Sequence, residues 1–163
     1  MVAAWLKWTD QADEVWLVPA YDHAFDKALA PFELRLRACA LQAAVLGPWC
    51  RAEPIEATLP APSYTIRTLD ALAAAWPQHR LRWVLGADVL ESLHLWKDWR
   101  RILADYLPII VGRAGYPVVA GAPTFPAFSS TEVRDRLKAG LPIDDLVLAE
   151  VRDLVLANRA AFS

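Results

Sequence analysis

Short apolar runs alternate with longer helix-patterned segments along this chain, and this alternation most constrains its fold. The strand-like runs lie at residues 14–19, 49–56, 81–85 and 107–111. Segments with apolar residues at helical spacing lie between and after them, at 2–11, 31–46, 65–76, 98–106, 132–138 and 148–160. Strands and helices in this order are typical of βαβ units. We therefore predict an α/β fold with a Rossmann-like, mostly parallel sheet and helices on both faces.

Length and composition narrow the class of protein. The 163 residues predict a single domain, long enough to bury a sizeable core. The net charge of −2 gives no basic footprint for nucleic acid, and no apolar run approaches the roughly 20 residues that a membrane span needs. Cys39 and Cys50 lack metal-ligand spacing, so we expect no protein-bound metal and a reduced, cytoplasmic setting.

The strand at 81–85 leads into the stretch with the most candidate residues. Gly86 is expected to end the strand and let the backbone turn, and Asp88 follows at the carboxyl end, where open α/β sheets bind ligands. Trp96 and Trp99 come soon after, among eight tryptophans in the chain. One interpretation is a nucleotide crevice with an aromatic wall. The other is that Asp88 caps the next helix and both tryptophans belong to the core.

Residues 128–134, FSSTEVR, are the second candidate stretch. Hydroxyl-rich residues open a helix there, so backbone N–H groups and the positive end of the dipole would face one anion. Arg134 lies one turn into this helix and could bind a phosphate with both arms of its guanidinium. The alternative is an ordinary Ser/Thr cap beside a surface arginine. Residues 62–68, PSYTIRT, form a second helix start with the same two interpretations.

The remaining candidates follow the first strand. His23 and Lys27 lie in the loop at 20–30, where they either meet a phosphate or are solvated loop residues. No Ser-His-Asp order, metal cluster or phosphate-binding P-loop motif is visible in the sequence. Right-handed crossovers bring the carboxyl ends of parallel strands to one edge, so we expect the loops after the strands to converge there. The residues support binding of phosphate and base without covalent catalysis.

Six pieces in order resemble one family. They are VWLVP, PSYTIRTL, WVLGAD, LWKDW, IIVGRAGYP and FSSTEVRDRLKAG, and they extend from residue 14 over nearly the whole remaining chain. Together they resemble the bacterial nicotinate-nucleotide adenylyltransferases, within the nucleotidyltransferase α/β superfamily. The resemblance implies transfer of AMP from ATP to nicotinate mononucleotide, giving deamido-NAD and pyrophosphate in NAD biosynthesis. It implies ATP and nicotinate mononucleotide as partners, with Mg²⁺ accompanying ATP.

The resemblance also assigns roles to individual residues. Five residues would bind ATP. Ser130, Thr131 and Arg134, at the start of the helix at 132–138, would hold the triphosphate. Gly86 and Asp88, in the Gly-x-Asp piece, would meet the ribose and base. In the mononucleotide set, Trp96 would stack on the nicotinate ring and Thr65 would offer its backbone to the nicotinate carboxylate. Lys27 would lie near phosphates.

Two departures from the family pattern stand out. The family usually has an acidic residue at the position of Arg67. It also begins with a strand and a Gly-rich loop carrying Phe-Asp-Pro and a His-x-x-His-type motif, whereas Met1 here falls in the following helix. The first strand and the catalytic histidines are therefore expected to be missing, because none of the three histidines, His23, His79 and His94, occupies such a loop. Catalytic residues remain unassigned, and we expect the 163-residue chain by itself to bind ATP weakly and turn over little.

Two alternatives to an active nicotinate-nucleotide enzyme remain open. One is a catalytically impaired nucleotide-binding remnant. The other is a different nucleotidyltransferase of the superfamily, with a cytidylyl or pantetheine substrate, although Trp96 and the SYT piece favour nicotinate. The sequence leaves open whether the chain forms a homo-oligomer, the preference between nicotinate and nicotinamide mononucleotide, and the role of Arg67.

Overall fold

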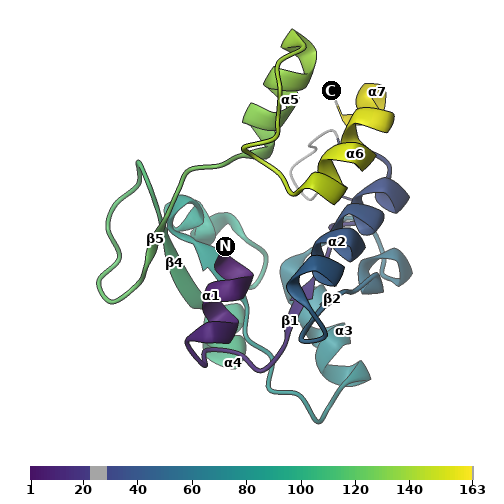
Figure 1. The fold of residues 1–163 in the computed structure, drawn as a ribbon. Helices are drawn as coiled ribbons and strands as arrows, with labels where there is room; N and C mark the ends of the chain where they lie inside the picture. The colour runs from purple at the N-terminus through teal and green to yellow at the C-terminus, as the bar shows by residue number, and fades with distance from the viewer. Residues whose placement is uncertain (23–28, 163) are drawn as a thin grey trace. The chain divides into compact units, whose positions relative to one another are not determined.

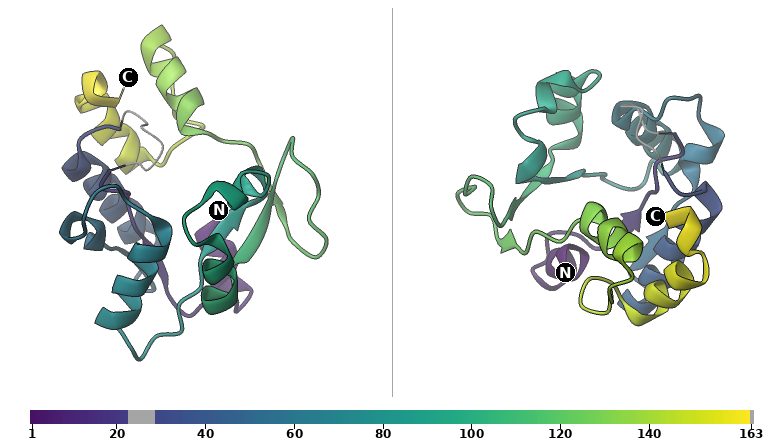
Figure 2. Two further views of the ribbon diagram at one scale, coloured as in Figure 1. Left: turned by 180° about the vertical axis from the view of Figure 1, so that it is seen from behind. Right: turned by 90° about the horizontal axis from the view of Figure 1, so that it is seen from above.

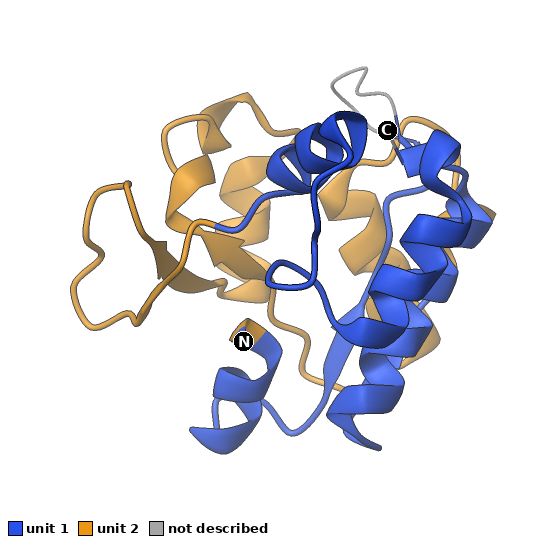
Figure 3. Cartoon of the chain, turned by 45° about the horizontal axis from the view of Figure 1, so that its top comes forward, with its two compact units in different colours: residues 1, 3–54, 128–163 blue, residues 2, 55–127 orange. Residues whose placement is uncertain are grey.

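The computed structural model describes residues 1–22 and 29–162, which form two compact units (Figure 3). Unit 1 comprises residues 1, 3–54 and 128–163, and unit 2 comprises residues 2 and 55–127. Each unit has its own parallel strands and its own apolar core. The prediction of a single domain stays a prediction.

Unit 1 is built on a βαβ motif. Strand β1 (Val15–Leu17) leads through helix α2 (Phe32–Leu46) to strand β2 (Cys50–Ala52), and the two strands pair in parallel. Helix α2 packs against β2 and alongside helix α6, as Figures 1 and 2 show. The helix starts after Pro31 and ends at Gly47, whose φ of 113° suits glycine. The predicted ends of this helix are therefore confirmed.

The other helices of unit 1 come from both ends of the chain. Helix α1 (Val2–Trp8) opens the chain, and helices α5 (Ser130–Ala139), α6 (Ala149–Ala157) and α7 (Arg159–Phe162) close it. Leu137, Ile143 and Val155 are buried against one another, which joins α5 to α6 through the segment between them. The single helix predicted at 148–160 is two helices, because the backbone leaves helical geometry at Asn158 (φ −123°).

Unit 2 carries a three-stranded parallel sheet in the order β3–β4–β5. The strands are β3 (Val84–Gly86), β4 (Ile109–Arg113) and β5 (Thr124–Phe125), and helix α4 (Trp99–Tyr106) connects the first two. Helix α3 (Thr65–Ala75) and three 3₁₀ helices, η1 (Ile55–Thr58), η2 (Ala87–Val89) and η3 (Leu93–Leu95), complete the unit. Its core joins α3 to α4 through buried side chains of Ile66, Leu69, Ile102 and Tyr106.

The strand pairings confirm the α/β class with a mostly parallel sheet. All three pairings among the described strands are parallel. Strand β5 lies in the stretch 112–127, which is rich in glycine and proline and which the sequence does not identify as containing a strand. Two residues between prolines show no alternation to detect, whereas in the structure Gly112 pairs opposite Thr124 and allows a close approach. Within the described ranges, no helix has the length and apolar character to cross a membrane.

A polar network fixes α3 against α4 in unit 2. The Tyr106 hydroxyl donates to Asp70 Oδ1 at 2.7 Å, and Arg101 donates to the same carboxylate at 2.5 Å and to Asp105 at 3.1 Å. Burial and then the hydrogen bond to Asp70 raise the pKa of Tyr106 to about 12. The network therefore helps to hold the middle of α3 against α4.

Tyr106 predicts how stability depends on alkaline pH. Folding raises the pKa of the Tyr106 phenol from 10.0 to about 12. The protonated phenol therefore stabilises the folded state fully below pH 10, and this stabilisation is lost as the pH rises toward 12. Tyr106→Phe should lower the free energy of unfolding by about 1 kcal/mol at pH 8 and flatten its decline above pH 10. Urea unfolding from pH 8 to 11.5 checks this, with Tyr116→Phe at an exposed ring as control. Parallel pH curves for wild type and Tyr106→Phe would refute it.

Candidate nucleotide-binding site

Gly86 and Asp88 form the best-defined part of the site, at the carboxyl end of β3. Gly86 ends the strand with φ −76°, an ordinary value for any residue. A Cβ at this position would lie 2.2 Å from Asp88 Oδ1, which is too close for any atom pair. The strand ends at Gly86 and the chain turns into η2 there, as predicted, although the turn does not require a backbone conformation special to glycine. The missing side chain of Gly86 instead leaves room for the Asp88 carboxylate.

Arg113 holds that carboxylate from the next strand. Asp88 Oδ2 accepts a charged hydrogen bond from Arg113 Nη1, and the two side chains are 23% and 24% exposed. Asp88 comes two residues after Gly86, and Arg113 two residues after Val111, which pairs with Gly86. Asp88 therefore pairs with a neighbouring strand rather than capping a helix. It is an oriented, partly exposed carboxylate at the edge where parallel sheets bind ligands.

Trp96 lies between the core and the surface. It follows η3, and its ring centroid is 4.9 Å from that of Trp83 at an interplanar angle of 45°. Trp83 packs against the buried cluster of unit 2, whereas Trp96 itself is half-buried. Trp99 is also half-buried, at the start of α4, with Arg100 over its ring. Trp83 packs against the core, and it supports the Trp96 indole from one side. Trp96 itself is therefore not fully part of the core.

Thr65 opens α3, as predicted. The N-cap residue is Tyr64, and it makes no side-chain cap bond to the helix. The first turn is fixed from another direction, because Thr68 Oγ1 donates to Glu56 Oε1 at 2.7 Å and both residues are buried. This contact ties η1 to the start of α3. The backbone at Thr65 is therefore well positioned although no side chain caps it.

In unit 1, Ser130, Thr131 and Arg134 come together at the start of α5. Arg134 donates to Ser130 Oγ at 3.4 Å and to Thr131 Oγ1 at 3.2 Å, so its guanidinium lies over the first turn. Ser129 is the N-cap, and its Oγ accepts from the Glu132 N–H at 3.0 Å. A cation, two hydroxyls and the helix N-terminus thus share one place, which can bind an anion.

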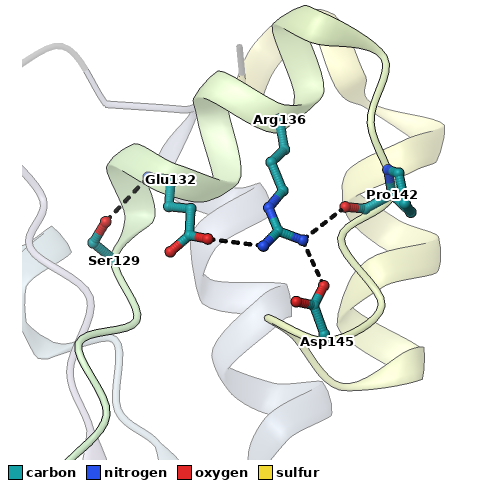
Figure 4. Close-up of polar contacts among 5 residues, drawn as sticks. All are labelled: Ser129, Glu132, Arg136, Pro142 and Asp145. Atoms are coloured by element: carbon teal, nitrogen blue, oxygen red, sulfur yellow. Dashed lines mark hydrogen bonds and ion pairs between the residues drawn. The ribbon is translucent and has the colours of Figure 1, made fainter.

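The rest of α5 is braced by Arg136, as Figure 4 shows. Its guanidinium binds Glu132 one turn earlier at 2.9 Å and Asp145 beyond the helix at 2.6 Å, and it donates to the Pro142 carbonyl at 3.2 Å. The hydrogen bond from Arg136 holds the pKa of Asp145 below its usual value. These contacts fix the direction of α5 within unit 1.

Capping of α5 gives a prediction on stability. Ser129→Ala removes the acceptor of the Glu132 N–H and should lower the free energy of unfolding by about 1 kcal/mol. Ser130→Ala is the matched control, because among the described residues that exposed hydroxyl accepts a single long bond, from Arg134. Urea titrations of both variants should separate them. Equal losses would mean that the cap contributes nothing.

The structure brings the predicted residues together in two groups. Unit 2 carries Gly86, Asp88, Trp96 and Thr65, and unit 1 carries Ser130, Thr131 and Arg134. Lys27 and His23 lie outside the described residues. The convergence of all the loops on one edge stays a prediction.

Arg113 and Glu56 are two residues that sequence reasoning missed. For Arg113 a signal existed, since it ends a strand just as Asp88 follows one, and charged residues at strand ends face the ligand edge. Glu56 lies in the segment 49–56, which was predicted as a strand, whereas in the structure it belongs to η1. No sequence pattern therefore indicated its hydrogen bond with Thr68.

Comparison with known proteins gives concordant matches, although no family model matches the chain. The chain is 45% identical over 153 residues to a probable nicotinate-nucleotide adenylyltransferase of Anaeromyxobacter sp. strain K, covering 93% of this chain and 82% of that protein. It is 36% identical over 150 residues to the protein of the same name from Myxococcus xanthus, covering 91% and 79%.

Solved structures share the fold. A Plasmodium falciparum nicotinic acid mononucleotide adenylyltransferase, complexed with NaAD, superposes with a TM-score of 0.78 at 16% identity, covering 99% of this chain and 88% of that one. A putative nicotinate-nucleotide adenylyltransferase from Vibrio parahaemolyticus superposes with a TM-score of 0.68, covering 96% and 83%. On the identity and coverage of its curated relatives, this chain belongs to the nicotinate-nucleotide adenylyltransferase family.

Proposed function

We propose that this protein transfers AMP from ATP to nicotinate mononucleotide, giving deamido-NAD and pyrophosphate. The observation that carries the proposal is that one unit presents an oriented carboxylate and an aromatic wall together, Asp88 held by Arg113 and Trp96 supported by Trp83. A carboxylate suits ribose hydroxyls and an indole suits a flat ring. The names of the curated relatives agree with this reaction.

The proposed chemistry needs positioning rather than a protein nucleophile. A phosphate oxygen of the mononucleotide forms a new bond to the α-phosphorus of ATP while the bond to pyrophosphate breaks. The start of α5, with Ser130, Thr131 and Arg134, would bind the triphosphate charge. Asp88 would accept hydrogen bonds from the ribose of ATP, with Gly86 leaving it space.

The mononucleotide half would lie against α3 and Trp96. Stacking on the indole would fix the plane of the nicotinate ring, and the backbone at Thr65 would donate to its carboxylate. The proposal keeps Lys27 near the phosphates. With these small molecules as partners, the proposed setting is the cytoplasm.

Mg²⁺ is proposed to come with ATP rather than to occupy a site of its own. Within the part of the chain that the structure describes, no group of three or more His, Cys, Asp or Glu side chains could hold a metal ion. Phosphate oxygens are ligands that Mg²⁺ accepts readily.

The test is formation of deamido-NAD from ATP and nicotinate mononucleotide. Products of long incubations are analysed by mass spectrometry, and binding of the mononucleotide is measured in parallel. We expect the protein to bind the mononucleotide. We expect the dinucleotide product to be deamido-NAD, formed in the same amount as pyrophosphate. Product from cytidine triphosphate or phosphopantetheine instead would support a different nucleotidyltransferase. If the protein neither binds the mononucleotide nor forms a product, the proposal is ruled out.

A further inference from the structure

Two cations lie against one aromatic ring beside the proposed nicotinate wall. The Arg67 guanidinium carbon is 4.9 Å from the centroid of the Tyr64 ring, and Lys97 Nζ is 4.8 Å from the same centroid. Tyr64 directly precedes Thr65, and Lys97 directly follows Trp96. Both cations thus adjoin the two residues proposed to hold the nicotinate ring, and all of these residues belong to unit 2.

The placement of these cations has an electrostatic cost. Arg67 lies in the first turn of α3, next to the positive end of the helix dipole, where a cation is disfavoured. That turn contains no acidic residue to offset it. Among the described residues, the contacts with Tyr64 are the interactions that Arg67 and Lys97 make, and neither forms an ion pair there. Two positive charges therefore gather at one ring, and neither is paired with a carboxylate among the described residues.

We propose that Arg67 and Lys97 determine specificity for the acid form of the mononucleotide, favouring nicotinate over nicotinamide. The inference rests on the proposed function, since it concerns the ring site at Trp96. Nicotinate carries a carboxylate where nicotinamide carries a neutral carboxamide, so the two substrates differ by one negative charge at nearly equal shape. Two nearby cations stabilise that charge and give the amide no equivalent gain.

The Tyr64 ring gives the two cations a defined place. A cation over an aromatic face is attracted by the ring quadrupole and loses part of its rotational freedom. Arg67 is half-buried, so its charge is screened less by salt than that of a fully exposed side chain. The pair should therefore act through charge and position, and direct contact with the nicotinate is not required.

The experiment compares the affinities of the two mononucleotides by isothermal titration calorimetry on the full 163-residue chain. Variants are Arg67→Gln, Lys97→Gln and the double variant. Arg80→Gln is the control, because it removes one exposed charge beyond the carboxyl end of α3, away from Thr65. Each single substitution should lower the ratio of nicotinate to nicotinamide affinity about two- to fivefold, and the double variant about tenfold. Circular dichroism checks that the variants remain folded.

The outcomes separate this inference from the proposed function. A falling ratio in the two variants, with an unchanged ratio in Arg80→Gln, supports the inference, and raising salt from 50 to 500 mM should shrink the wild-type ratio. Equal loss of both ligands, or an unchanged ratio, overturns the role of the cations while leaving the ring site intact. Wild type that binds neither mononucleotide overturns the proposed function itself.

Discussion

Replacing Gly86 with alanine is expected to displace the Asp88 carboxylate from its present position. The new Cβ would lie 2.2 Å from Asp88 Oδ1, while Oδ2 of the same carboxylate is held by Arg113. The carboxylate must therefore rotate away and weaken that ion pair. Because the group that must move is the end of a partly exposed side chain, we expect the free energy of unfolding to fall by about 1 kcal/mol. Affinity for deamido-NAD should fall about tenfold, because Asp88 would lose the orientation that the proposed contact with the ribose requires.

A double-mutant cycle isolates the cause of this loss. Among the described residues, and apart from the chain neighbours of Gly86, the atoms within 4 Å of the new Cβ belong to Asp88. In an Asp88→Ala background the methyl group therefore has space, and Gly86→Ala should change the free energy of unfolding by less than about 0.5 kcal/mol. Urea unfolding of the four proteins measures the coupling. If Gly86→Ala costs the same in both backgrounds, the glycine acts through the backbone and not through Asp88.

Removing the Trp96 ring is expected to lower the affinity for nicotinate mononucleotide about tenfold. The affinity for ATP should fall less than about twofold. Stacking between flat rings contributes about 0.5–1.5 kcal/mol beyond the burial of area, and the indole is supported for it by Trp83. Trp96→Ala deletes this wall, whereas Trp96→Phe should restore part of the affinity. Calorimetric titration of each ligand measures the difference.

The controls for this prediction address folding and position. Trp8→Ala removes a tryptophan that is 77% exposed in unit 1, so it should change neither affinity. Trp83→Ala should lower stability as well as affinity, since Trp83 packs against the core. If Trp96→Ala weakens both ligands equally, Trp96 serves the core, as the alternative interpretation holds.

The fold class was predictable because hydrophobic periodicity acts locally. Helix α2 between Pro31 and Gly47, and α5 between Ser129 and Gly140, start and end at residues whose backbone preferences need no tertiary information. Strand β5 was not predictable, since two residues carry no period and their pairing depends on the close approach at Gly112. Such short strands form because they pair with a segment distant in the sequence, and no local pattern in a single sequence indicates that pairing.

The site shows the same division. Asp88 was predictable from its place after a strand, and Ser130, Thr131 and Arg134 from their place at a helix start. Three contacts joining residues distant in the sequence were not predictable, namely Arg113 on Asp88, Glu56 on Thr68, and Lys97 on Tyr64. These contacts depend on which strand or helix lies beside which. They orient the residues that the sequence identified.

The most direct test of the central claim is the affinity for deamido-NAD, because this product contains both the adenylate and the nicotinate halves. Equilibrium titration is made with wild type, Asp88→Ala, Trp96→Ala and the double variant. The claim predicts that each single variant weakens binding about tenfold, Asp88→Ala through the adenylate half and Trp96→Ala through the nicotinate half, with nearly additive free energies in the double variant. Unchanged affinity in both single variants, with folding intact, would contradict the assignment of Asp88 and Trp96 to the two halves of one nucleotide site.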